Sequence, residues 1–142
     1  MATTLQCEIV SAEESLFSGS VKMIIATGTE GELGILPGHT PLLTGLRPGP
    51  VRVKMADDTE EVFYVNGGYM EVQPKVVTLL ADTAARANDI DEAAAEEARQ
   101  RALDAIEGKQ SELDYTTAAA QLAEAVAQLR TIQQLKKKYG AK

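Results

Sequence analysis

The spacing of apolar residues changes abruptly near Asp89, and this change limits what the chain can fold into. Before about Leu80, apolar residues alternate with polar ones, as in Leu5, Cys7 and Ile9, which is typical of strands that bury one face. After Asp89, apolar residues recur every three or four positions and proline is absent, as in amphipathic helices. The sequence therefore predicts a β-domain at residues 1–84 and a helical domain at residues 85–142.

The β-domain consists of short apolar runs separated by turn-forming residues. Pro37-Gly38, Pro48-Gly49-Pro50 and Asn66-Gly67-Gly68 are the clearest of these turns. Many short strands at such spacing are typical of an antiparallel sandwich or barrel. About eighty residues make a small core, so we expect modest stability.

The helical domain is predicted to be an antiparallel two-helix hairpin, because only a short link joins its two periodic segments. Asp89 and Glu92 form a plausible capping pair, and Gly108 is placed for a left-handed C-terminal cap. The expected apolar stripes are Ile90, Ala94, Ala98, Ala102 and Ile106, broadened by Leu103, in the first helix, and Tyr115, Ala118, Leu122, Ala125, Leu129, Ile132 and Tyr139 in the second.

The seam between these helices is rich in alanine, which buries little area at roughly 25 cal/mol per Å². A hairpin joined this weakly could be held in either of two surroundings, or it could simply stay docked on the β-domain. The sequence leaves both possibilities open.

Composition excludes several classes of protein. The formal net charge of −7 argues against nucleic-acid binding, which needs a basic face. No apolar run approaches the roughly 20 residues that a membrane-spanning helix needs. The N-terminus lacks the pattern of a signal or transit peptide, so we expect the protein to stay in the compartment where it is made. The lone Cys7 is expected to pack inside a strand.

The sequence gives no indication of catalysis, of a metal site or of a cofactor. It contains one histidine, His39, and one cysteine far from it, without a nucleophile motif. The glycine-rich segment at residues 28–34 lacks the Lys-Ser/Thr ending of a phosphate-binding loop, so it is interpreted as a tight turn. We therefore expect a protein that is not an enzyme.

One long segment makes the chain recognisable. Residues 28–49 have the sequence G-T-E-G-E-L-G-I-L-P-G-H-T-P-L-L-T-G-L-R-P-G, followed in order by Tyr64-Val65-Asn66-Gly67-Gly68 and Asp89-Ile90-Asp91. This pattern closely resembles the epsilon subunit of bacterial F-type ATP synthases, and the resemblance covers essentially the whole chain. It implies an α+β fold, with a ten-stranded antiparallel β-sandwich followed by the two-helix hairpin.

The resemblance also implies a role and partners. Members of this family are non-catalytic central-stalk subunits that link the gamma subunit to the c-ring of the proton-translocating enzyme. They are peripheral proteins at the cytoplasmic face of the bacterial inner membrane, with no direct membrane insertion. Their hairpin either packs on the sandwich or extends along gamma into the catalytic alpha/beta ring, where it inhibits ATP hydrolysis.

Carried over residue by residue, the resemblance predicts three sites. Glu30, Glu32 and His39 are expected to contact the c-ring. The inhibitory segment would comprise Leu122, Leu129, Arg130, Ile132, Lys136, Lys137 and Lys138. Some family members bind ATP between the two domains; here Asp91 and Arg101 match that site, but Ala94 occupies the position of its first arginine, so ATP binding should be weak or absent.

Two alternatives remain at this point. The chain could be an unrelated adapter that binds a partner through its hairpin. It could also be a small nucleotide-binding regulator outside any rotary enzyme, although that role needs the arginine that Ala94 replaces.

Overall fold

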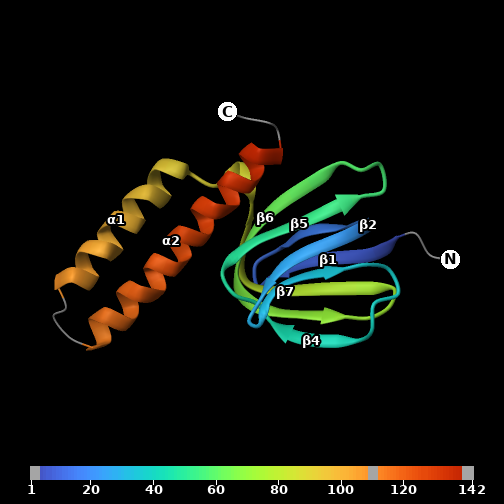
Figure 1. Cartoon of the computed structure of the whole chain (residues 1–142), viewed down its shortest axis with the longest axis horizontal. Helices are drawn as coiled ribbons and strands as arrows, with labels where there is room; N and C mark the ends of the chain where they lie inside the picture. The colour runs from blue at the N-terminus through green and yellow to red at the C-terminus, as the bar shows by residue number, and fades with distance from the viewer. Residues whose placement is uncertain (1–3, 109–111, 139–142) are drawn as a thin grey trace.

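The computed structural model describes residues 4–108 and 112–138, with the backbone alone at 112–114 and 138. A compact set of β-strands is followed by two long helices that lie along one side of it (Figure 1). None of the helices in the described part of the chain is long and apolar enough to cross a lipid bilayer.

Seven strands form one sheet that curls back on itself. Hydrogen bonds connect the strands in the order β1-β7-β6-β5-β2, and β2 also pairs with β1, so the ring is closed. The two remaining strands extend this ring, β3 on β2 and β4 on β6. The strand bounds are β1 Leu5–Ser11, β2 Ser15–Gly28, β3 Gly31–Ile35, β4 Leu42–Gly45, β5 Gly49–Met55, β6 Glu60–Val72 and β7 Val76–Arg86.

The expected count of ten strands is wrong in detail, because long strands run through both layers without a break. The first half of β2 pairs with β1, and its second half pairs with β3 and β5. Likewise β6 pairs with β5 near its start and with β4 near its end. The pairing is antiparallel throughout except between β1 and β7, which run parallel. The predicted two-layer β-domain is otherwise confirmed.

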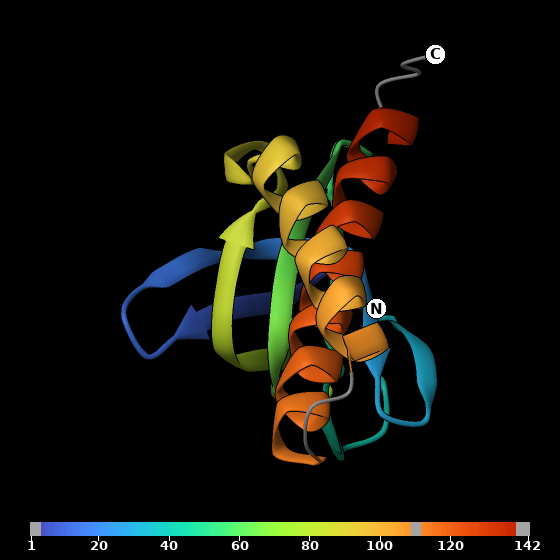
Figure 2. The same ribbon diagram turned by 90° about the vertical axis from the view of Figure 1, so that its left-hand side faces the viewer.

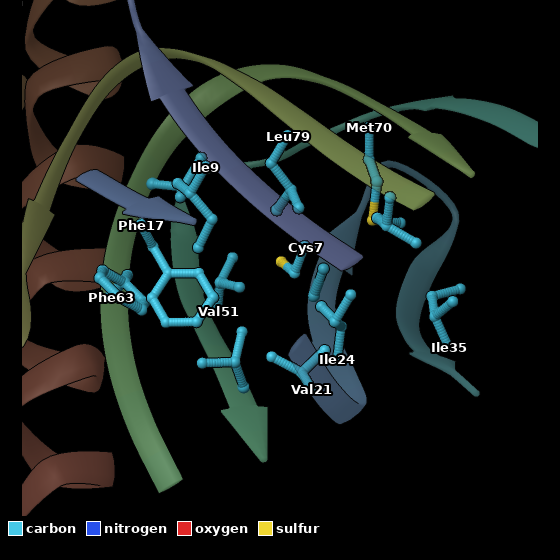
Figure 3. Close-up of a cluster of buried hydrophobic side chains, with 14 of the residues drawn as sticks. Cys7, Ile9, Phe17, Val21, Ile24, Ile35, Val51, Phe63, Met70 and Leu79 are labelled. Carbon is cyan, nitrogen blue, oxygen red and sulfur yellow. The ribbon is translucent and has the colours of Figure 1, made fainter. Parts of the chain in front are cut away.

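The core lies between the layers and is mostly aliphatic (Figure 3). Leu5, Cys7 and Ile9 all point into it, as their alternation predicted. Phe17 and Phe63 meet edge to face in this core, with ring centroids 5.6 Å apart. Burial raises the pKa of the Cys7 thiol to about 12, which makes this cysteine a packing residue.

The helices are the short 3₁₀ turn η1 Ala87–Asp89, α1 Glu92–Gly108 and α2 Glu112–Lys138. They form the predicted antiparallel hairpin. Figures 1 and 2 show that α2 lies between α1 and the sheet, and its sheet contacts are with β5 and β6. The last strand continues to Arg86, past the expected boundary at residue 84.

Both expected helix caps are wrong. The N-terminal cap of α1 is Asp91, whose Oδ1 accepts a hydrogen bond from the Ala94 amide at 3.1 Å, while Asp89 belongs to η1. Gly108 is the last residue of α1 and does not adopt the left-handed conformation of a cap.

The predicted apolar stripes are correct in part. In α1 the buried residues are Ala95 and Ala102, and Ala94 is exposed. In α2, Ala118, Ala125 and Ile132 are buried, whereas Leu122 and Leu129 are only half-buried. Tyr115 is 47% exposed and Tyr139 lies outside the described residues. The hairpin therefore buries its small side chains and leaves several larger ones at the surface.

Candidate functional site: the cleft beneath the hairpin

The hairpin docks on a small platform at the outer surface of β5 and β6. Along β6, Phe63 and Val65 face the sandwich core, so Val62 and Tyr64 face outward. These two outward side chains are nevertheless only 5% and 3% exposed, because α2 covers this part of the sheet. On α2 itself, Ala127 and Thr131 are buried. The platform joins the two domains through few large side chains.

A cleft of about 510 Å³ opens between the platform and the hairpin. It is lined by β7, by the segment between β7 and α1 (residues 87–91, here called the linker), by both helices and by Tyr64 of β6. Its charged and polar lining residues are Tyr64, Thr83, Asp89, Asp91, Arg101, Glu124 and Gln128. The structure thus brings together Asp91 and Arg101, the two residues matched to the nucleotide site, and places Ala94 beside them.

The electrostatics of this cleft do not favour a phosphate. Three carboxylates, those of Asp89, Asp91 and Glu124, line it, and Arg101 is the single basic residue among the lining residues described. Asp91 already uses one oxygen to cap α1. Two other arginines point elsewhere: Arg99 pairs with Glu96 along α1, and Arg86 donates to the carbonyl oxygen of Leu16 at 2.6 Å.

We expect a calorimetric titration with ATP to show no saturable binding below the millimolar range. A missing charge-assisted phosphate contact costs roughly 1.5–3 kcal/mol. Ala94→Arg is the matched gain-of-charge variant, at an exposed position where the fold tolerates it. It should tighten binding by about tenfold or more. Micromolar affinity of the unmodified chain would contradict the expectation.

Tyr64 has the one buried side-chain oxygen without a hydrogen-bond partner in the described part of the chain. Burial raises the pKa of this phenol strongly, the Glu124 carboxylate raises it further, and hydrogen bonding with the Gln128 amide lowers it. Gln128 is therefore the α2 side chain that is placed to hydrogen-bond to the hydroxyl, although its amide lies outside strict hydrogen-bond geometry.

The linker that carries the hairpin is anchored at Arg86. Its guanidinium binds the Leu16 carbonyl, stacks 5.5 Å from the centre of the Phe63 ring, and lies 3.8 Å from Glu61. These contacts fix the end of β7 directly before η1. Movement of the hairpin relative to the sandwich would therefore begin after Arg86.

An ion pair closes the open end of the hairpin. Lys136 Nζ lies 3.1 Å from both carboxylate oxygens of Glu92, at the start of α1. The two side chains are about half exposed, 53% and 52%, so the pair contributes little, about 0–1 kcal/mol. Arg130 and Lys137 are exposed and form no ion pair within the described residues. The side chain of Lys138 lies outside the described part.

The acidic tip, which we define as Glu30 and Glu32, is at the turn between β2 and β3, and both side chains are exposed. The structure does not bring His39 to this tip. His39 follows the far end of β3, a strand of five residues that spans about 15 Å at roughly 3.3 Å per residue. There Gly38 bonds to the carbonyl oxygen of Pro74, and His39 Nδ1 lies 2.7 Å from the Thr40 carbonyl.

One further surface of the β-domain was not predicted from the sequence. Leu43 of β4, Tyr69 of β6, and Val76 and Leu80 of β7 share the outside of the sheet, since Tyr69 pairs with Leu80 and Leu43 pairs with Glu71, two residues from Tyr69. These four side chains, here called the outer apolar face, are 40–70% exposed. Adjacent apolar pairs such as Val76-Val77 and Leu79-Leu80 were the available signal, because one member of each pair must face outward.

No group of three or more metal-ligating side chains occurs among the described residues. The described residues combine a docked helical hairpin, a cleft beneath it that is lined by more carboxylates than basic groups, an acidic tip and an apolar outer face.

Comparison with known proteins identifies the family of this chain. Residues 4–87 match the family model of the ATP synthase delta/epsilon chain β-sandwich domain, and residues 88–133 match that of its long α-helix domain. A curated relative from Chromohalobacter salexigens, named ATP synthase epsilon chain, is 67% identical over 135 residues, which are 95% of this chain and 96% of the relative.

Two solved structures share the fold. One chain from the Euglena gracilis mitochondrial ATP synthase (OSCP/F1/c-ring) superposes with a TM-score of 0.83 at 20% identity, covering 89% of this chain and 80% of that one. A chain from the central stalk/c-ring of the Tetrahymena thermophila mitochondrial ATP synthase gives 0.58 at 12% identity, covering 92% and 95%. With both of its domains matched in order and a relative at 67% identity, this chain belongs to the ATP synthase delta/epsilon chain family.

Proposed function

We propose that this chain is the non-catalytic epsilon-type subunit in the central stalk of a proton-translocating ATP synthase, joining the gamma subunit to the c-ring. The observation that carries the proposal is the 67% identity, over nearly the whole length of both chains, with a relative named ATP synthase epsilon chain. In this role the protein is peripheral, at the cytoplasmic face of the bacterial inner membrane. An unrelated adapter is no longer a competing interpretation.

The outer apolar face is the surface that fits gamma. Single exposed apolar residues are common on soluble proteins, but a continuous group on one sheet face marks an interaction site. Here Tyr69 and Leu80 are direct cross-strand neighbours, and Leu43 extends the group onto the next strand. A partner that covers this face would bury all three.

The acidic tip is the part that fits the c-ring. Glu30 and Glu32 project from a tight turn whose backbone is held by the bond from the Thr29 amide to the Gly45 carbonyl, at 3.0 Å. Carboxylates held in this way are suited to basic loops, although one exposed ion pair contributes only about 0–1 kcal/mol. His39, at the far end of β3, would need a separate contact.

Two substitutions test the rotor role. Tyr69→Glu should abolish co-purification with gamma, because it places a charge in an apolar contact. Glu32→Lys should keep gamma bound but weaken the coupling of ATP hydrolysis to proton pumping in membranes. Glu13→Lys, on the exposed turn between β1 and β2, is the matched charge reversal and should change neither. Retention of gamma by Tyr69→Glu, or unchanged pumping with Glu32→Lys, would contradict the respective assignment.

The hairpin is proposed to inhibit ATP hydrolysis in an extended placement in the catalytic alpha/beta ring. The supporting observation is the outward side of α2, where Tyr115, Leu122, Val126 and Leu129 recur at helical spacing. Tyr115 and Val126 are 47% and 38% exposed, while the docked seam buries alanines. The basic residues Arg130 and Lys137 follow on the same helix and would meet an acidic partner.

A further inference from the structure

Strand β6 has a break in its pairing at Asn66 and Gly67. Its ladder with β5 ends at Val65, and its ladder with β4 starts at Tyr69. On the other side, the pairing with β7 passes from Asn66 to Gly68 and omits Gly67. Gly67 also has a φ of 76°, outside the range of a regular strand. The Asn66–Gly67 peptide therefore lies outside the regular ladder that holds the rest of β6.

The Asn66 side chain is not held in place by a hydrogen bond. It is half-buried, and its amide takes part in no side-chain hydrogen bond within the described ranges 4–108 and 112–138. An asparagine amide can be attacked by the backbone nitrogen of the next residue, and glycine obstructs this approach least because it has no side chain. In this chain the next residue is Gly67.

A carboxylate from β7 lies beside the same nitrogen. Asp82 is opposite Gly67, and its Oδ2 is 2.7 Å from the position that a Cβ of Gly67 would occupy. That position and the Gly67 nitrogen are each one bond from the same Cα. Asp82 is exposed and forms no ion pair with any other described residue. The register of β6 and β7 thus brings together an amide, a nucleophilic nitrogen and a base.

We propose that Asn66 is a site of spontaneous deamidation that the fold itself promotes, with Asp82 as the general base. The Gly67 nitrogen attacks Cγ of Asn66 and passes its proton to the Asp82 carboxylate. The Cγ–Nδ2 bond then breaks, and Nδ2 leaves as ammonia with that proton. Water opens the resulting succinimide ring to aspartate or, with the backbone rerouted through Cγ, to isoaspartate. This inference goes beyond the proposed function and does not depend on it.

Isoaspartate should disturb the sheet more than aspartate does. It lengthens the β6 backbone shortly before Gly68, which lies so close to β7 that a Cβ there would be 2.1 Å from the Leu80 carbonyl oxygen. Aspartate adds only a charge. The aged chain should therefore unfold at a lower Tm than fresh Asn66→Asp, which carries the charge alone. Equal Tm values would contradict this consequence.

Peptide mapping of the full-length isolated chain, after incubation at neutral pH, tests the site. Trypsin separates the two asparagines of the chain, because Asn66 is in the peptide of residues 55–75 and Asn88 is in that of residues 87–99. Asn88 is the more exposed of the two, but the residue after it is Asp89, which has a side chain. Isoaspartate should accumulate in the first peptide at least about tenfold faster, a barrier difference of about 1.4 kcal/mol. Equal rates would overturn the proposal.

Unfolding and one substitution isolate the role of the fold. In urea Asp82 no longer lies beside Gly67, so Asn66 should react at least as fast in the folded chain as in the unfolded one. Asp82→Asn should slow the folded reaction by roughly a hundredfold, the low end of what a positioned base contributes, and leave the unfolded rate unchanged. Glu71→Gln neutralises another exposed carboxylate of β6 and should change neither rate. A faster reaction in urea, or an unchanged folded rate in Asp82→Asn, would overturn the proposal.

Discussion

Replacing Gly68 with alanine is expected to destabilise the β-domain by about 3–5 kcal/mol, enough to prevent much of the protein from folding at 37 °C. A Cβ at this position would lie 2.1 Å from the Leu80 carbonyl oxygen and 2.9 Å from the Ala81 Cα. Both atoms belong to the backbone of β7, so no side chain can move aside. The φ of 107° is also one that residues with a side chain rarely adopt.

Thermal unfolding followed by circular dichroism measures the effect, and two other Gly→Ala variants separate its causes. A domain of this size loses roughly 4–8 °C per kcal/mol, so Gly68→Ala should lower Tm by at least about 12 °C. Gly31 has a φ of 129° but open space around it, so Gly31→Ala reports the backbone strain alone. Gly108 is helical and has open space around it, so Gly108→Ala should stabilise the helix by up to about 1 kcal/mol. Equal Tm values for all three variants would contradict the steric argument.

The sequence predicted the layers of this fold better than their connections. Alternation in β1 identified Leu5, Cys7 and Ile9 as core residues, because a strand between a core and solvent must place successive side chains on opposite faces. Alternation does not specify pairing partners. It therefore could not indicate that β2 and β6 pass through both layers, or that β1 runs parallel to β7.

The start of α1 was predicted wrongly for a different reason. Asp89 and Asp91 carry the same short carboxylate side chain two positions apart, so each is a suitable cap by composition. The choice between them depends on where the linker leaves β7, and the contacts of Arg86 with Leu16 and Phe63 set that point. These contacts join residues far apart in the chain, so local sequence carries no information about them.

The candidate site was predictable only where its residues are close in sequence. Asp91, Ala94 and Arg101 belong to one helix and its cap, so the resemblance located them together and the structure places them in one cleft. Tyr64 and Glu124 reach the same cleft from β6 and α2. Their meeting depends on how the hairpin docks, which no periodicity in the sequence specifies.

Removing the chain after Asp89 is expected to leave assembly and ATP synthesis intact and to raise ATP hydrolysis. The sandwich should fold without the hairpin, because its buried cluster consists of residues from the strands and the loops that join them. If the inhibitory placement is favoured by about 1 kcal/mol, it holds roughly five-sixths of the enzymes, and truncation would raise hydrolysis about sixfold. Hydrolysis by reconstituted enzyme, with and without the hairpin, measures this directly.

Point substitutions then divide the inhibition between charge and apolar packing. Lys136 is unsuitable for this purpose, because it pairs with Glu92 in the docked hairpin and its loss would act on both placements. Arg130 and Lys137 are exposed and unpaired within the described residues, so Arg130→Ala with Lys137→Ala removes charge from the extended placement alone. This double variant should reproduce part of the rise in hydrolysis, most clearly at low salt, since exposed pairs are screened within about 8–10 Å.

Leu122→Ala with Leu129→Ala is the matched apolar variant on the same helix. If it raises hydrolysis and the charge variant does not, apolar packing rather than charge holds the extended state. Glu92→Gln gives the opposite test of the docked state. Breaking its pair with Lys136 should release the hairpin and lower hydrolysis, at most by the factor of about five that 1 kcal/mol allows. If the truncated enzyme hydrolyses ATP at the rate of the intact one, the hairpin of this protein does not inhibit, and the exposed side of α2 requires another partner.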